Sequence, residues 1–138
     1  MHPVYFLLEE EDILISHIAV VWEVLPHVSQ EYKAYGFTEV FTYPAFRKQG
    51  YGLQLVRSAK QYIEQREDAD LIIFHSSRRG FYEHEGFEPM SSMVTLVGEP
   101  QNPGRSNEIG FIRFLSEQGQ QGREQFAKGT LYFGDETW

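Results

Sequence analysis

Over the first third of the chain, the hydrophobic residues fall into three β-type runs that are separated by polar turns. Val4 to Glu9 and Ile13 to Val24 are rich in β-branched and aromatic residues, and Glu10-Glu11-Asp12 between them is polar. After a polar loop from Pro26 to Glu31, the segment from Tyr32 to Tyr43 has the same β-type character. The pattern therefore predicts three strands that follow one another as an antiparallel meander.

After Tyr43 the apolar residues change to a spacing of three or four, which is the repeat of one face of an α-helix. These apolar positions are Leu53, Val56, Ala59, Tyr62 and Ile63. They predict a helix from Gly50 to Arg66, and Asp70 to Ser76 then has the apolar character of a buried strand. A short helix is expected from Gly80 to Glu85. A meander followed by a strand, helix and strand crossover predicts an α/β chain with a mixed α+β sheet.

The rest of the chain predicts further strands and one helix. Phe87 to Val97 is expected to form one long strand or a pair of strands, and Gln101 to Asn107 is a turn-rich linker. Glu108 to Leu115 begins as a strand or a helix, Ser116 to Lys128 is expected to be helical, and Thr130 to Phe133 forms a last strand.

Composition and charge exclude several classes of protein. A chain of 138 residues with 41% hydrophobic residues forms one folded domain, and the absence of cysteine excludes disulfides, a thiolate nucleophile and a cysteine zinc site. The net charge of −8 argues against a nucleic-acid partner and favours a cationic one. The apolar runs are too short to span a membrane and no basic leader is present, so a cytoplasmic location without membrane contact is expected. The five histidines show no metal-ligand spacing, so no metal is expected.

The junction between the third strand and the long helix has the arrangement of an anion-binding loop. Pro44 ends the strand signal, and Gly50 and Gly52 lie at the start of the helix, where free amide N–H groups and the helix dipole favour an anion. The P-loop pattern is absent, and the dinucleotide fingerprint fails because Leu55 stands where a third glycine is needed. Seven of the twelve basic residues lie between positions 47 and 79: Arg47, Lys48, Arg57, Lys60, Arg66, Arg78 and Arg79. Alternatively, Arg57, Lys60 and Arg66 only solvate the outer face of the helix.

Two motifs carry a resemblance to a known family. The Arg-x-x-Gly-x-Gly pattern from Arg47 to Gly52 resembles the acetyl-CoA pyrophosphate loop of the GCN5-related N-acetyltransferases (GNAT). Phe81 to Phe87 is similar to the Phe-Tyr-Glu-x-x-Gly-Phe signature that follows the fifth strand of that family. Their order and spacing also match, so the resemblance implies a GNAT-like fold and an acetyl-CoA-dependent N-acetyltransferase. Ile15 to Val21 and an acidic tail that ends in Trp138 resemble the aminoglycoside 2′-N-acetyltransferase branch.

The resemblance also implies the roles of particular residues. Backbone at Val40 to Tyr43 would pair with the pantetheine arm of acetyl-CoA, and amides near Lys48 to Leu53 would hold the pyrophosphate. Tyr82 would protonate or hydrogen-bond the departing thiolate, with a purely packing role as its alternative. The cofactor-binding residues implied in this way are Phe41, Thr42, Tyr43, Arg47, Lys48, Gln49, Gly50, Tyr51, Gly52, Leu53, His75 and Tyr82.

The general base is less well defined by the resemblance. The family often places a glutamate on the strand that enters the loop, which makes Glu39 the candidate. Counting back from Arg47 puts Thr38 at the expected position, and a shift of one residue along a strand reverses the face unless a bulge restores it. Glu39 would otherwise be a surface carboxylate. His75 is either a proton acceptor or a packed histidine at the end of a strand.

The chain also departs from the family pattern. It starts at the meander, without the usual first strand and two helices, so residues 1–97 are expected to form an abbreviated acetyl-CoA-binding core and residues 98–138 an extension packed on the same domain. In the family, the missing helices commonly form one wall of the acceptor site. Three explanations are open: a partner chain supplies this wall, as in a homodimer, the site is unusually open, or the domain is a natural truncation. Asp135, Glu136 and the Trp138 carboxylate would attract a small cationic amine, or simply form a solvated terminus. Acetylation of a protein or peptide and non-catalytic binding of acetyl-CoA are the alternatives.

Overall fold

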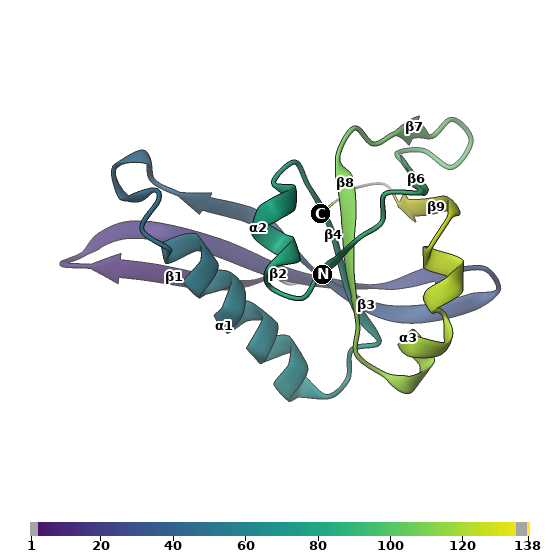
Figure 1. The fold of residues 1–138 in the computed structure, drawn as a ribbon, viewed down its shortest axis with the longest axis horizontal. Helices are drawn as coiled ribbons and strands as arrows, with labels where there is room; N and C mark the ends of the chain where they lie inside the picture. Colours follow the sequence, from purple (N-terminus) through teal and green to yellow (C-terminus); the bar gives the residue numbers. More distant parts are fainter. Residues whose placement is uncertain (1–2, 135–137) are drawn as a thin grey trace.

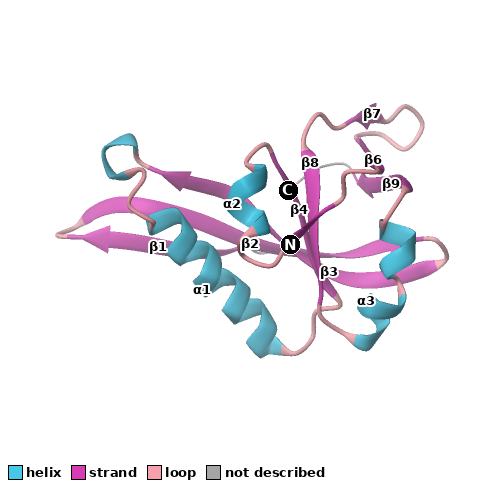
Figure 2. Cartoon of the chain, in the orientation of Figure 1, coloured by secondary structure: helices cyan, strands magenta, loops and turns pink. Residues whose placement is uncertain are grey.

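The computed structural model describes residues 3–134 and 138, which form two sheets with helices packed against them (Figures 1 and 2). The larger sheet has the order β1-β2-β3-β4-β8-β5, and the smaller one has the order β7-β6-β9. This is the mixed α+β sheet that the sequence predicts. The strands are β1 Val4–Glu10, β2 Ile13–His27, β3 Gln30–Thr42, β4 Leu71–Ser76, β5 Glu88–Pro89, β6 Met93–Val97, β7 Gly104–Arg105, β8 Ile109–Phe114 and β9 Gly129–Gly134. The helices are η1 Pro44–Phe46, α1 Tyr51–Arg66, α2 Arg79–Glu83, α3 Glu117–Gln121 and η2 Arg123–Phe126.

The meander is confirmed, but its second connection is much tighter than expected. The polar loop predicted from Pro26 to Glu31 is wrong, because β2 continues to His27 and β3 begins at Gln30. The two residues between them, Val28 and Ser29, have φ values of 46° and 62°. Positive φ at both central positions is the geometry of a type I′ hairpin turn, which usually contains glycine or asparagine. A valine there gave no turn signal.

Helix α1 covers one face of the meander, as its hydrophobic spacing predicts. Leu55, Val56, Ala59 and Ile63 are buried on that helix and belong to the main core. The helix contacts β1, β2 and β3 and crosses them obliquely in Figure 1. Glu67 in the left-handed conformation ends it, with its amide bonded to Glu64 O. The packing of this buried face on the strands holds the start of α1 close to the end of β3.

Strands β3 and β4 are parallel and stay paired over a short distance only. Their register joins Ala34 to Leu71 and Tyr35 to Ile72, and no further pair follows in the part of the chain that the structure describes. On its other side β4 pairs antiparallel with β8 along its whole length, from Leu71–Phe114 to Ser76–Ile109. The ends of β3 and β4 therefore separate, and their carboxyl ends face the start of α1 and of α2.

The C-terminal segment supplies β8 to the large sheet and then forms the small sheet with β6. The helix expected from Ser116 to Lys128 is wrong in part, because α3 ends at Gln121 and a 3₁₀ helix follows after Gly122. A side chain at Gly122 would lie 2.3 Å from the Tyr32 hydroxyl, and one at Gly119 would lie 2.2 Å from Asp70 O. These glycines permit close packing of the segment against β3 and the start of β4. None of the helices in the described residues is long and apolar enough to cross a membrane.

Trp138 fills the space where β3 and β4 separate. Its indole Nε1–H donates to Ile73 O at 2.6 Å, and its backbone oxygen accepts from His75 N at 2.7 Å. The ring lies over Gly36, where an added Cβ would come within 1.7 Å of the indole nitrogen. The side chain is 7% exposed. Trp138 thus satisfies two backbone groups of β4 that have no partner on β3.

Candidate active site

The loop between β3 and α1 presents free amide groups at the start of a four-turn helix. Gly50 has φ 83° and precedes α1, and the first bond of the helix runs from Gln54 N to Gly50 O at 3.0 Å. The amides of Tyr51, Gly52 and Leu53 therefore have no acceptor within the helix. No side-chain cap occupies this end, and the first turn holds no acidic residue. The arrangement suits an anion that is supplied from outside the chain.

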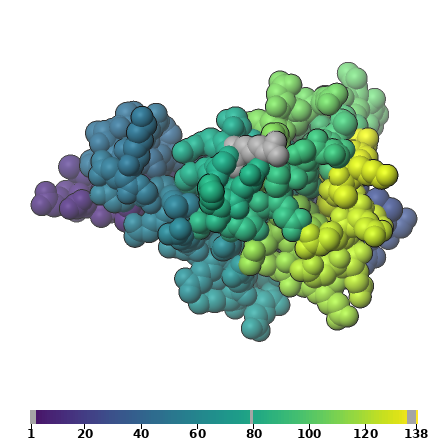
Figure 3. Space-filling view, viewed as in Figure 1, coloured from purple at the N-terminus to yellow at the C-terminus, as the bar shows by residue number. Residues whose placement is uncertain are grey.

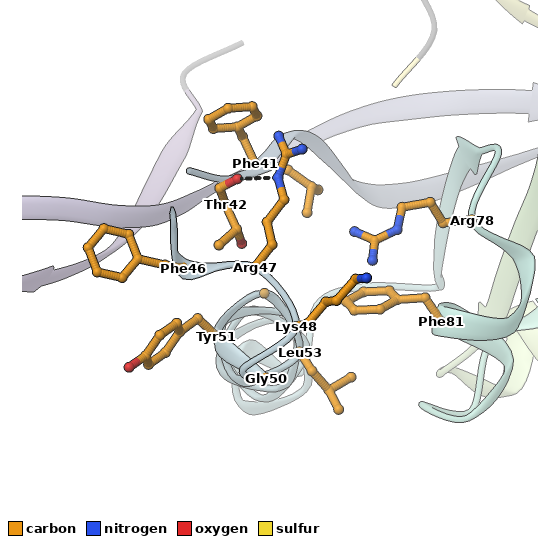
Figure 4. A pocket seen from close by; sticks show the side chains of 12 residues that line it. Phe41, Thr42, Phe46, Arg47, Lys48, Gly50, Tyr51, Leu53, Arg78 and Phe81 are labelled. Carbon is orange, nitrogen blue, oxygen red and sulfur yellow. Dashed lines mark hydrogen bonds between the residues drawn. The ribbon is translucent and has the colours of Figure 1, made fainter. Parts of the chain in front are cut away.

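A cavity of about 700 Å³ lies above this loop (Figure 4). It is lined by Val40, Phe41, Thr42, Phe46, Arg47, Lys48, Gly50, Tyr51, Gly52, Leu53, Arg78 and Phe81. A side chain at Gly52 would come within 3.3 Å of Thr42 Oγ1 and extend into this space, whereas Gly52 leaves it open. Of the loop and strand residues that the resemblance implies, Tyr43 and Gln49 do not line the cavity. Phe46, Arg78 and Phe81 line it although the sequence did not assign them to the cofactor.

The charge of this cavity is opposite to that of the whole protein. Arg47, Lys48 and Arg78 line it, and none of its lining residues is acidic, although the net charge of the chain is −8. Arg47 donates from Nε to Thr42 O at 2.8 Å and stacks on Phe41, with 5.2 Å from Cζ to the ring centre. Lys48 and Arg78 extend into the space between the loop and α2 (Figure 4). A polyanion with an apolar arm fits this mixture of cations, amides and aromatic rings.

The basic residues along the outer part of α1 are used in contacts within the protein. Arg57 Nε donates to Glu85 at 2.8 Å, and Lys60 Nζ donates to Glu85 O at 2.8 Å. Arg66 donates to the Tyr35 hydroxyl at 3.0 Å. These three side chains do not line the cavity above the loop. The interpretation that they only solvate the outer face of the helix is therefore wrong in part, because each of them makes a hydrogen bond within the protein.

A second cavity, of about 330 Å³, adjoins the first at Val40 and Arg78, which line both. It lies between the separated ends of β3 and β4. Two glutamates and a tyrosine from three different elements line it: Glu39 from β3, Glu108 before β8 and Tyr82 from α2. The remaining lining residues are Phe37, Thr38, Phe74, His75, Ser76, Ser77 and Trp138. A molecule that extends from one cavity to the other would pass Val40 and Arg78.

Tyr82 is held in an aromatic cluster at the base of the second cavity. Its ring centre lies 4.6 Å from that of Phe74, 4.8 Å from Phe81 and 5.4 Å from Phe111. Burial raises the pKa of the Tyr82 phenol above its ordinary value of 10.0, and Arg78 and Ser76 offset part of that increase. The phenol is therefore protonated at neutral pH. Tyr82 lines the second cavity, and Phe81, whose ring it contacts, lines the first.

Glu39 lies in a β-bulge. Ala19 pairs with Thr38, but His17 pairs with Phe41, so β3 holds one extra residue between these two pairs. Glu39 takes φ 53°, which is uncommon for a residue other than glycine. The bulge that would correct the count from Thr38 is thus present, and it places the exposed Glu39 among the residues that line the second cavity. A side-chain hydrogen bond with Glu39 raises the pKa of Tyr5 on β1.

His75 is packed, and both of its ring nitrogens have partners. Nδ1 lies 3.2 Å from Trp138 O, and Nε2 lies 3.1 Å from Thr95 Oγ1. The ring also contacts Phe133 edge-on at 4.7 Å. Burial lowers the pKa of His75 below its ordinary value of 6.5. These contacts fit a packed histidine at the end of a strand, which was one of the two interpretations of this residue.

This burial predicts a loss of stability in mild acid. Because the pKa of His75 is lower in the folded state, the unfolded chain binds more protons below about pH 6.5, so the free energy of unfolding falls as the pH falls through that value. We expect urea denaturation to show a smaller fall between about pH 7 and about pH 5.5 in His75→Gln than in the wild type. His84→Gln, at an exposed position, is the control and should keep the full fall. An equal fall in all three proteins would contradict this assignment.

Two other expectations concern the acidic tail and a metal site. Asp135 and Glu136 lie outside the described residues, whereas Trp138 lines the second cavity. Among the described residues there is no group of three or more histidine, aspartate or glutamate side chains that could hold a metal ion.

The family is shown by a direct match. A family described as "Acetyltransferase (GNAT) domain" matches residues 2–89, which is more than half of the chain and includes both motifs. The chain belongs to the GNAT family. No curated protein matches the chain in sequence.

Solved structures show the same fold at low sequence identity. The GNAT acetyltransferase YhbS of Escherichia coli in complex with CoA is 15% identical over 91% of this chain, with a TM-score of 0.62. A GNAT acetyltransferase of Brucella melitensis in complex with acetyl-CoA is 24% identical over 61% of the chain (TM-score 0.51), and the NatC complex bound to Gag peptide and CoA is 20% identical over 78% (TM-score 0.56). The chain spans 63%, 52% and 65% of these three proteins, and 21% of a GNAT structure from Kribbella flavida.

Proposed function

We propose that this protein is an acetyl-CoA-dependent N-acetyltransferase that acts on the primary amine of a small cationic molecule. One observation carries the proposal: a cavity lined by three basic residues adjoins one that is lined by Glu39, Glu108 and a protonated tyrosine, with Arg78 shared by both. The basic cavity with its free amides suits the pyrophosphate and pantetheine of acetyl-CoA. The second cavity, with Glu39 and Glu108, suits a positively charged amine. CoA and acetyl-CoA in two of the neighbouring structures support this choice of acetyl donor.

The proposed reaction is a direct transfer in a complex of enzyme, acetyl-CoA and amine. Glu39 accepts a proton from the ammonium group, directly or through water, and the amine nitrogen then uses its lone pair to form a C–N bond with the thioester carbonyl carbon. The C–S bond breaks, its electron pair passes to sulfur, and the nitrogen loses its second proton to water as the amide forms. The Tyr82 phenol gives its proton to that sulfur. The products are an N-acetyl amide and the free thiol of CoA, and exchange with solvent restores both side chains.

The charge of the second cavity supports the choice of acceptor. The two carboxylates of the second cavity favour a small amine that carries at least one further positive charge, as the aminoglycoside 2′-N-acetyltransferase resemblance also implies. Because a neighbouring structure, the NatC complex, is bound to a peptide, peptides are the acceptors to compare with small amines. Non-catalytic binding would leave the positions of Tyr82 and Glu39 without a role. We keep a cytoplasmic location and a homodimer as predictions of the sequence.

Calorimetry with acetyl-CoA, followed by measurement of thiol release, tests the proposal. We expect binding of acetyl-CoA and faster thiol release with di- and polyamines than with neutral monoamines or peptides. Lys48→Glu should weaken binding of acetyl-CoA, whereas Lys128→Glu, an equal change of charge at an exposed position outside the cavity, should not. Failure to bind acetyl-CoA would contradict the function. Binding without thiol release for any amine would establish a non-catalytic module instead.

Glu39 gives a prediction about the base. We expect Glu39→Gln to lower turnover at pH 7 by about 100-fold, because the amine then loses its proton acceptor. The loss should shrink as the pH rises, since a larger fraction of the amine is already neutral. Glu31→Gln, on the same strand but outside both cavities, should retain full activity. If Glu39→Gln keeps wild-type turnover at every pH, Glu39 is not the base.

A further inference from the structure

We propose that two copies of this chain associate through β1, with the β1 strands of the two copies paired antiparallel so that their large sheets become continuous. The inference does not depend on the proposed function. It gives a defined surface to the homodimer, which the sequence left as one explanation. Strand β1 is the outermost strand of the large sheet and lies along the outer side of β2 (Figure 2). Part of this N-terminal region, in purple, projects at the left end of the molecule (Figure 3).

The outer edge of β1 has backbone groups whose natural partner is another strand. Every second residue of an edge strand directs its N–H and C=O groups away from the sheet. In the part of the chain that the structure describes, β1 pairs with β2 and with no other strand. This edge is seven residues long, from Val4 to Glu10, whereas β5 at the opposite edge has only two residues. Strand β1 is therefore the longer of the two edges of the large sheet.

The side chains of β1 are apolar on both faces of the sheet. Phe6 and Leu8 are half-buried and pack against the main core, where the Phe6 ring lies 5.4 Å from that of Tyr62 on α1. Tyr5 and Leu7 alternate with them and point to the opposite face, where they are 52% and 53% exposed. A second strand beside β1 would cover part of this apolar surface, and its burial would stabilise the pair.

Strand β1 also lacks the features that usually protect an edge from pairing with another chain. Such edges commonly carry a lysine, a proline or a bulge. From Val4 to Leu8 the register with β2 is regular, and the segment contains no charged residue and no proline. The half of β2 after Val20 is also unpaired on this side, but it contains Glu23 and Pro26, and proline has no N–H to donate. Of these two unpaired stretches, only the one on β1 is unprotected.

The charges that follow this segment favour a second copy as the partner and an antiparallel direction. An acidic run from Glu9 to Asp12 follows a register shift after Leu8. In an antiparallel pair, the acidic runs of the two copies lie at opposite ends of the interface. In a parallel pair they would lie side by side and repel each other. The charge pattern therefore selects the arrangement with two-fold symmetry, in which each copy presents the same surface to the other.

The apolar segment is complementary to itself in that arrangement. An antiparallel pair centred on Phe6 joins Tyr5 of each copy to Leu7 of the other, and Val4 to Leu8. Each of these pairs combines apolar side chains on the same face of the sheet, which is the kind of cross-strand contact that stabilises a sheet. The segment thus supplies both the free backbone groups and the matching side chains.

Sedimentation velocity at increasing protein concentration tests the dimer. We expect the wild type to dimerise as the concentration rises, and the amides of Val4 to Leu8 to exchange hydrogen more slowly in the dimer. Leu7→Lys should raise the Kd of the dimer about 100-fold, because each dimer loses the apolar contact twice and gains two lysines at the paired edges. Val28→Lys makes the same kind of change at a 62% exposed position in the hairpin turn after β2, and it should leave the Kd unchanged.

The remaining outcomes would overturn the inference. It fails if the wild type stays monomeric at every concentration, or if Leu7→Lys dimerises as tightly as the wild type. Val24→Lys tests the unpaired half of β2 at an equally exposed position, 53%. If Val24→Lys raises the Kd and Leu7→Lys does not, the copies meet at β2 and the assignment to β1 is wrong. Hydrogen exchange in the wild type decides the matter even if Leu7→Lys does not fold, because exchange in β1 that is independent of concentration excludes the pairing.

Discussion

Replacing Tyr82 with phenylalanine is expected to lower kcat by about 100-fold, because general acid catalysis by a positioned side chain typically contributes 10²- to 10⁴-fold. The pKa of Tyr82 is raised mainly by burial, so at neutral pH the phenol carries the proton that the departing thiolate needs. The affinity for acetyl-CoA should stay unchanged, since Tyr82 does not line the cavity above the glycine loop. Thiol release and calorimetry measure the two quantities.

Stability and a control variant separate chemistry from packing in this experiment. Phenylalanine keeps the ring contacts with Phe74 and Phe111, so the free energy of unfolding should change little. Tyr62→Phe also removes one phenol, but it does so on α1, outside both cavities, and should retain wild-type kcat. A Tyr82→Phe protein with full turnover would exclude Tyr82 as the acid and leave it as an aromatic anchor.

The parts of the fold that the sequence predicted are those that depend on local patterns. The three-to-four spacing from Leu53 to Ile63 indicated α1, and the structure begins that helix one residue after Gly50. The apolar run from Asp70 to Ser76 indicated a buried strand, and β4 begins at Leu71. In both cases the hydrophobic pattern and the element that it predicts lie in the same short segment, so the periodicity was sufficient to locate the element. The glycine loop was found for the same reason.

The parts that the sequence did not predict depend on contacts between distant residues. Gly122, which follows the end of α3, packs closely against Tyr32, and the turn at Val28 and Ser29 joins the long paired strands β2 and β3. Arg78 reaches the cofactor cavity only because β4 and β3 separate at their ends. None of these relations leaves a local pattern. The bulge at Glu39 could be suggested only from the family spacing, since glutamate has no preference for that conformation.

The contact of Trp138 with β4 predicts the largest effect on stability. Trp138→Ala should lower the free energy of unfolding by about 3–5 kcal/mol, the usual cost of removing a large buried aromatic side chain. The indole is 7% exposed, contacts Phe133 at 4.7 Å between ring centres and donates to Ile73 O. Removing it also leaves Ile73 O without this partner. Urea denaturation at neutral pH measures the change.

The second tryptophan of the chain provides the matched control. Trp22 is 41% exposed and contacts Lys33 and Tyr35 at the surface of the meander, so Trp22→Ala should cost about 1 kcal/mol, within the ordinary range for single substitutions. Gly36→Ala should also destabilise the protein, because its Cβ would occupy the position of the Trp138 indole. The double variant with both Gly36→Ala and Trp138→Ala should then lose less stability than the sum of the two single variants, since either substitution displaces the same ring. Equal costs for the two tryptophan variants would show that Trp138 does not hold the separated strands together, and the wall of the second cavity would have to be stabilised by the contacts of Phe133 and His75 instead.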